Sequence, residues 1–291
     1  MARCPDVRML SKTRVEKIAR NAWLHDKDAI MTNDGSNPGH QHGADDIPAN
    51  WTVAELVIQH PVLREMLERL GVDYCCGGKK LLAAAVADAG HDWSTVRNEL
   101  LQALASSAGG TPPADWNTTA LGALADHILE KHHVFTKTQL LRLDGLLAKV
   151  QNAHGAHHGV VLESLRSVFD DLRTELDAHL LKEEQILFPA IKGIDVFMSG
   201  RGERPAIHCG SVGHPIRQME HEHDGAGQAL AAMRRITANY RLPADACQTY
   251  CALYDGLQAL EADLHEHIHL ENNILFPRSV ALEEDMNTRH A

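Results

Sequence analysis

The chain has 291 residues and a formal net charge of −11 with His neutral, so it can bury a sizeable core and is a poor general partner for nucleic acid. No apolar run is long enough to span a membrane, and the charged N-terminus lacks the apolar core of a secretory signal. The six cysteines do not suit a disulfide framework in a chain this long, which favours a reducing, cytoplasmic setting.

The first residues carry little sign of a folded core. Residues 1–49 are expected to form a disordered or doubtful N-terminal extension, because the polar, turn-rich stretch TNDGSNPGHQHGADDIP ends them. A small helical domain is expected over 50–107. It begins with the capping box TVAE, in which Thr52 precedes Glu55 by three residues.

Gly and Pro cluster where the apolar periodicity of this small domain stops. Residues 108–117 are therefore predicted to be a linker between two independently folding units. A longer break of the same kind is predicted at 193–215.

Residues 118–283 show apolar side chains at spacings of three and four, which predicts an all-α four-helix bundle. Each helix contributes one stripe to the core. The four stripes are Leu140, Leu143, Leu147 and Val150; Leu162, Leu165, Phe169, Leu172 and Leu176; Ile216, Met219, Ala226, Leu230 and Met233; and Tyr250, Leu253, Leu257, Leu260 and Leu264.

One motif occurs twice in the bundle, as HLLKEEQILFP at 179–189 and HIHLENNILFP at 267–277. Each copy places His and Glu four residues apart, in phase with the apolar stripe, and the stripes extrapolate to Ile186 and Ile274. A His on the preceding helix lies 46 residues before the first copy and 44 before the second. The six side chains predicted to converge in the core are His133, His179, Glu183, His223, His267 and Glu271. His132 competes with His133, although the stripe favours His133.

Six such groups on a core-facing stripe need partners, because a buried unpaired carboxylate costs several kcal/mol or becomes neutral. A His–Glu hydrogen-bonded network is one interpretation. Metal binding explains the duplicated set better. The absence of Cys argues against structural zinc, whereas mixed imidazole and carboxylate suits two iron or manganese ions bridged by the two Glu. Oxo or hydroxo bridges would complete such ions, and open positions could bind O2 or NO.

The motifs HLLKEEQILFP, EHEHDGAG and HIHLENNILFP resemble the hemerythrin-like di-iron domain of the iron–sulfur cluster repair proteins, the repair of iron centres family. GVDYCCGGKK resembles the short cysteine-bearing domain that precedes it there. The resemblance covers about residues 51–280. It implies a hemerythrin-like four-helix bundle after a small helical domain, with two non-haem irons on the six residues above and with Glu183 and Glu271 bridging both.

The resemblance also implies roles for residues outside this ligand set. Glu175 and Glu222 match acidic residues near the family's site, where proton or iron transfer and a merely solvent-facing or supporting role are both open. His154 is expected beside the ligands. Cys75 and Cys76 are expected to be partly thiolate and to bind or pass iron or undergo redox exchange; the alternative is a pair of buried, inert thiols.

Two classes of function follow from the resemblance. The first is repair of iron–sulfur clusters damaged by nitrosative or oxidative stress, by iron donation or by NO reduction, the latter making the protein an enzyme. Its partners would be damaged iron–sulfur proteins, with O2 or NO as small ligands and with a homodimer left open. The second is an O2 or NO sensor without turnover, which would have no need of the two thiols.

Overall fold

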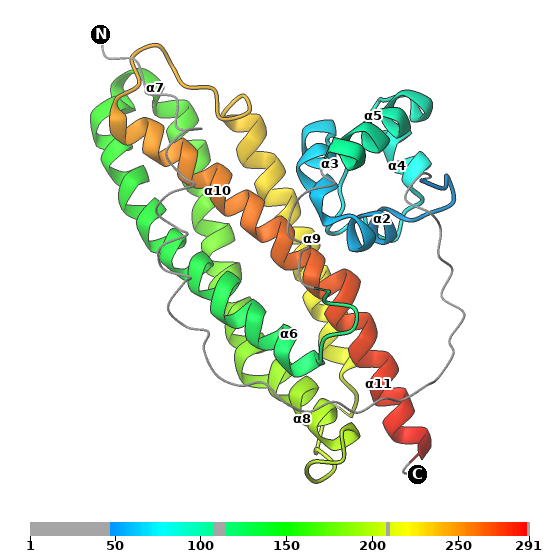
Figure 1. Cartoon of the computed structure of the whole chain (residues 1–291). Helices are drawn as coiled ribbons and strands as arrows, with labels where there is room; N and C mark the ends of the chain where they lie inside the picture. Colours follow the sequence, from blue (N-terminus) through cyan, green and yellow to red (C-terminus); the bar gives the residue numbers. More distant parts are fainter. Residues whose placement is uncertain (1–46, 107–114, 208–209, 290–291) are drawn as a thin grey trace, which may run out of the picture. The chain divides into compact units, whose positions relative to one another are not determined.

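A computed structural model describes residues 47–106, 115–207 and 210–289 (Figure 1). The expected N-terminal extension to residue 46 and most of the expected linker lie outside these residues. The described residues form helices and no strand, which confirms the all-α prediction. Within the same residues, no helix combines the length and the apolar character needed to cross a membrane.

The small N-terminal module is a set of short helices around its own core. Its capping box is formed as predicted, because Glu55 N donates to Thr52 Oγ1 at 3.2 Å and Thr52 N donates to Glu55 Oε2 at 2.7 Å. The core contains buried residues from every helix of the module. The elements are α2 (Val53–Gln59), η3 (Pro61–Leu63), α3 (Arg64–Leu70), α4 (Leu82–Asp88) and α5 (Trp93–Ser106).

Four helical rods make up the rest of the described chain, and short π-helical turns interrupt three of them. The α7 helix contributes to two of the rods (Figure 1). The chain reverses direction between them at His158, where the φ of −122° and the ψ of 17° are not helical. The elements are α6 (Leu121–His127), η4 (Ile128–His133), α7 (Val134–Lys182), η5 (Glu183–Leu187), α8 (Phe188–Met198), α9 (Gly213–Ile236), α10 (Gln248–Leu270), η6 (Glu271–Leu275) and α11 (Phe276–Arg289).

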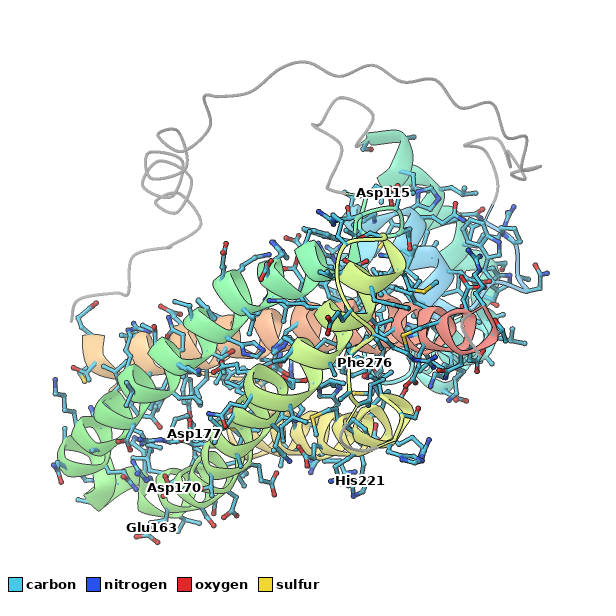
Figure 2. All side chains as sticks on the ribbon, turned by 90° about the horizontal axis from the view of Figure 1, so that it is seen from below. Asp115, Glu163, Asp170, Asp177, His221 and Phe276 are labelled. Carbon is cyan, nitrogen blue, oxygen red and sulfur yellow. The ribbon has the colours of Figure 1, made fainter. Side chains whose placement is uncertain are left out.

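The predicted apolar stripes face one another in the bundle core, and all of their members are buried. Carboxylates occupy the outer face of the second rod of α7, where Figure 2 shows Glu163, Asp170 and Asp177. Burial of one face and solvation of the other accounts for the helical periodicity of the sequence.

The extrapolated stripe is wrong at Ile186, which is 49% exposed, whereas Leu187 is only 1% exposed. Both lie in η5, and a π turn holds more residues than an α turn, so the buried position moves by one. Ile274 is buried as predicted. The break predicted at 193–215 is also too long, because α8 continues to Met198 and buries Ile194.

The small module packs directly on α10. Ile268 of α10 is buried in the core of the module, and Arg64 of α3 forms an ion pair with Glu266 at 3.0 Å. Asn273 Nδ2 donates to Tyr74 O at 3.1 Å. The module and the bundle therefore belong to one compact unit.

Candidate metal centre

The six predicted side chains lie together in the bundle core, each at most 3% exposed. They form two groups whose potential ligand atoms lie within 4.8 Å of one another. One group joins His133 and His267 to the two carboxylates, and the other joins His179 and His223 to the same carboxylates.

Each carboxylate spans both groups through its two oxygens. Glu183 has Oε2 at 3.4 Å from His133 Nε2 and Oε1 at 3.3 Å from His179 Nε2. Glu271 has Oε1 at 2.9 Å from His267 Nε2 and Oε2 at 3.1 Å from His223 Nε2. Two neighbouring positions are therefore each surrounded by two imidazole nitrogens and two carboxylate oxygens.

Local π-helical turns accompany this arrangement. The turns η5 and η6 begin at Glu183 and Glu271, and η4 ends at His133. A π turn changes the direction of the side chains that follow it, and such turns are common at functional sites. The duplicated sequence motif thus corresponds to a duplicated backbone feature.

Neighbouring polar groups orient three of the four imidazoles. His133 Nδ1 pairs with Glu184 Oε1, His179 Nδ1 with Glu222 Oε2 and His223 Nδ1 with Asn272 Oδ1, each at 2.8 Å. These contacts hold a proton on Nδ1 and turn Nε2 towards the carboxylates, which is the orientation that metal-binding histidines require. His267 is held differently, by stacking on His132 with ring centroids 5.5 Å apart.

Sequence reasoning missed Glu184 and Asn272. Each directly follows the Glu of one motif copy, and each contacts the His of the preceding helix in its own half. That repeated position is the signal that could have identified them.

The donor set fits metal ions. Both oxygens of Glu183 and Oε2 of Glu271 are buried without a hydrogen-bond partner, and so is His133 Nε2. Burial opposes a charge on His179, but the Glu183 and Glu271 carboxylates outweigh that effect and raise its pKa to about 9. The centre therefore demands positive charge, which two divalent ions would supply.

His132 lies outside both groups. Its Nδ1 contacts Asp263 Oδ1 at 3.0 Å, and its ring packs against His267 instead of joining Glu183 and Glu271. The geometry thus agrees with the stripe in favouring His133.

Glu175 and Glu222 flank a cavity of about 20 Å³ beside His179 and His223. Burial opposes ionisation of Glu222, but hydrogen bonds from Lys182, Gln218 and His179 lower its pKa to about 2. Glu175 is exposed at the edge of the cavity. A space of this size suits one water or one diatomic molecule.

The expectation that His154 lies beside the ligands is wrong. His154 is close to the reversal of α7 at His158, where it contacts Asp245 at 3.9 Å and packs on the Tyr250 ring. Twenty-five residues separate it from His179, which corresponds to well over 20 Å of helix.

Cys75 and Cys76 lie over α9, and Cys76 Sγ is 3.7 Å from the carbonyl oxygen of His223. Their sulfurs are 3.8 Å apart, and both backbone amides donate to Asp73 Oδ1 at 3.0 Å. The dithiol also borders a cavity of about 570 Å³.

The expected thiolate character is wrong for Cys75. Its hydrogen bond with Cys76, its burial and the Asp73 carboxylate raise its pKa well above the usual value. Two lysines follow the cysteines, but their charges do not lower the pKa of Cys75, because Lys79 pairs with Glu220 at 2.9 Å and Lys80 pairs with Asp88.

Comparison with known proteins agrees with this architecture. The hemerythrin HHE cation-binding domain matches residues 124–279, and a domain of unknown function (DUF542) matches residues 49–104. The chain is 39% identical over 231 residues to the iron–sulfur cluster repair protein YtfE of Enterobacter sp. (strain 638), covering 79% of this chain and 97% of that protein. The YtfE proteins of Citrobacter koseri and Escherichia coli O81 are each 38% identical over the same shares.

Proposed function

The chain belongs to the family of iron–sulfur cluster repair proteins that carry a hemerythrin HHE domain, and from this membership we propose that it repairs iron–sulfur clusters damaged by nitrosative or oxidative stress. Its clients would be damaged iron–sulfur proteins. A cytoplasmic location is a prediction from the sequence, which leaves a homodimer open.

The proposal depends above all on the two buried carboxylates, whose oxygens each face a different histidine. In our proposal His133, His267 and one oxygen of each Glu hold one iron, and His179, His223 and the other oxygens hold the second. Two ferrous ions held in this way would supply reducing electrons, a binding position for a diatomic such as NO, and iron that can be donated.

The residues around this centre would control which small molecules reach the irons and how protons are transferred there. The small cavity beside His179 and His223 admits a molecule no larger than water or a diatomic. Glu222 holds the Nδ1 proton of His179 and is itself held by Lys182. Glu175, at the edge of the cavity, is the residue we propose to exchange protons with solvent.

The adjacent thiols fit repair better than sensing. In our proposal Cys75 and Cys76 handle iron or a nitrosylated fragment between a client cluster and the bundle, because they border a large cavity next to His223. The alternative function, an O2 or NO sensor without turnover, does not require this dithiol.

The double variant Cys75→Ser, Cys76→Ser tests the repair function. The bundle supplies all of the proposed ligands, so the variant should retain its iron but reactivate an NO-treated iron–sulfur dehydratase at least several-fold more slowly. Cys247→Ser is the matched control, because Cys247 is a free thiol on a different part of the bundle.

Two outcomes would contradict this assignment. Unchanged reactivation would reduce the dithiol to a structural role, and loss of iron would make the thiols ligands. A wild-type protein that binds NO reversibly but never restores the dehydratase would favour the sensor.

A further inference from the structure

His267 is the one proposed ligand whose Nδ1 has no hydrogen-bond partner among the described residues. Its ring stacks on that of His132, with centroids 5.5 Å apart and ring planes at 13°. We propose that His132 and Asp263 position the His267 imidazole, with His132 accepting the Nδ1 proton through one enclosed water. The inference rests on the di-iron centre proposed above.

The duplicated motif indicates where such a partner belongs. In both halves of the bundle, the residue that follows the bridging Glu contacts the His of the preceding helix. A second position is used as well, because Glu222, directly before His223, pairs with His179 Nδ1 at 2.8 Å. The corresponding position in the other half is directly before His133, and His132 occupies it. His132 is therefore the counterpart of Glu222 for the fourth imidazole.

Asp263 prepares His132 for this role. His132 is 0% exposed, and its Nδ1 pairs with Asp263 Oδ1 at 3.0 Å. A carboxylate at this distance holds a proton on Nδ1, which favours the neutral tautomer whose Nε2 accepts a hydrogen bond. That Nε2 is buried and has no partner among the described residues. An acceptor nitrogen thus lies on a ring that stacks against a ligand in need of an acceptor.

One enclosed water joins the two nitrogens. Rings that stack with centroids 5.5 Å apart present their faces to each other, so their nitrogens do not meet along a straight N–H···N line. A buried water typically makes about three hydrogen bonds to buried polar groups. His267 Nδ1 donates to this water, and the water donates to His132 Nε2. Thr136 Oγ1, four residues beyond His132, is a third buried atom without a partner in the described chain and completes the set.

The bridge determines which nitrogen of His267 faces the carboxylates. His267 Nε2 is 2.9 Å from Glu271 Oε1. With a proton held on Nδ1, Nε2 is the nitrogen that binds metal, as at the other three imidazoles. A simple pair of His132 with Asp263 explains the 3.0 Å contact. It does not explain two buried, unpartnered nitrogens on stacked rings, or the correspondence with Glu222.

Iron binding by His132 variants, measured by competition with a chelator, tests the proposal. His132→Phe keeps a stacked ring but has no acceptor, so it should bind iron about 10–100-fold more weakly. His132→Gln restores an acceptor and should recover at least part of that loss. His127→Phe is the control and should leave iron affinity unchanged, because the His127 ring also packs on His132, with centroids 5.7 Å apart, but is no part of the bridge.

Two further measurements separate positioning from packing. Asp263→Leu should also weaken iron binding, and adding it to His132→Phe should cause little further loss, because Asp263 acts through His132. In the iron-loaded wild type, the Nδ1 proton of His267 should give a paramagnetically shifted NMR signal that exchanges with solvent. That signal should broaden or disappear in His132→Phe, while the signals of the other ligand imidazoles remain.

Equal iron affinity for His132→Phe and the wild type would overturn the proposal and leave His132 as a packing residue. Equal losses in the Phe and Gln variants, or fully additive losses with Asp263→Leu, would overturn it as well. If iron-free His132→Phe loses its helical circular dichroism, Asp263→Leu decides instead, and unchanged affinity there contradicts the proposal. Glu183→Gln separates this failure from that of the di-iron centre, because it should lose iron whatever His132 does.

Discussion

At the scale of single residues, the contacts behind the ligands define the centre as much as the ligands do. Asn272 Oδ1 accepts the Nδ1 proton of His223, and its Nδ2 donates to Cys75 O at 3.4 Å. One amide therefore orients a proposed ligand and touches the backbone of the dithiol. Such outer contacts commonly change metal affinity by about 10–100-fold when they are removed.

The variant Asn272→Leu should bind iron about 10–100-fold more weakly, because His223 loses the acceptor that fixes its tautomer. Asn272→Asp keeps an acceptor at the same place and should retain most of the affinity. Iron binding measured by competition with a chelator compares the two. Equal affinities for both variants and the wild type would show that Asn272 does not position His223.

The sequence identified the proposed ligands directly, whereas among their supporting contacts it singled out only Glu222. His and Glu four residues apart must share a helix face, so His179 with Glu183 and His267 with Glu271 were readable from spacing alone. Their outer partners come from other helices, and their positions depend on how the rods pack. The prediction for His154 is wrong for a related reason. Helix phase determines the direction of a side chain but not its position along the bundle axis.

At the scale of secondary structure, the three π turns set the register of the bundle around the centre. Apolar periodicity predicted every stripe residue up to the motifs. It failed at Ile186 because an α-helical period was continued through η5. Nothing in the apolar pattern marks a π turn. In the structure, the exposure of Ile186 beside the burial of Leu187 shows the shift in register.

Leu187→Ala and Ile186→Ala form a matched pair for this register. Leu187 is buried in a core cluster, so its truncation should lower the free energy of unfolding by about 2–5 kcal/mol. Ile186 is half exposed, and its truncation should change that free energy by only about 0.5 kcal/mol. Urea unfolding with both variants in the same metal state measures the difference. A larger loss for Ile186→Ala would contradict the register.

At the scale of the whole molecule, the sequence predicted two units and the structure packs them together. Ile268 is the one residue of the described bundle in the core of the module, and Ile58 of α2 packs against one of the two bundle clusters, whose fully buried residues all follow the linker. The packing of the module on α10 was not predictable, because a Gly- and Pro-rich connection does not reveal which surfaces meet.

A chain that begins at Asp115 should still fold and bind iron. Asp115 retains its contacts with Asn117 N and Thr118 Oγ1, and Arg278 keeps its acceptor Trp116 O. Circular dichroism and iron analysis test this expectation. Loss of helical structure or of iron would show that burial of Ile268 by the module is needed for the bundle.

The most direct test is the iron content of the wild type beside Glu183→Gln and Glu271→Gln, with Glu163→Gln as an exposed control. If both carboxylates bridge, the wild type and the control should hold about two irons per chain, and either core variant should lose most of its iron. The oxo-bridged optical spectrum should disappear with the metal. Full iron occupancy in both core variants would contradict the di-iron centre.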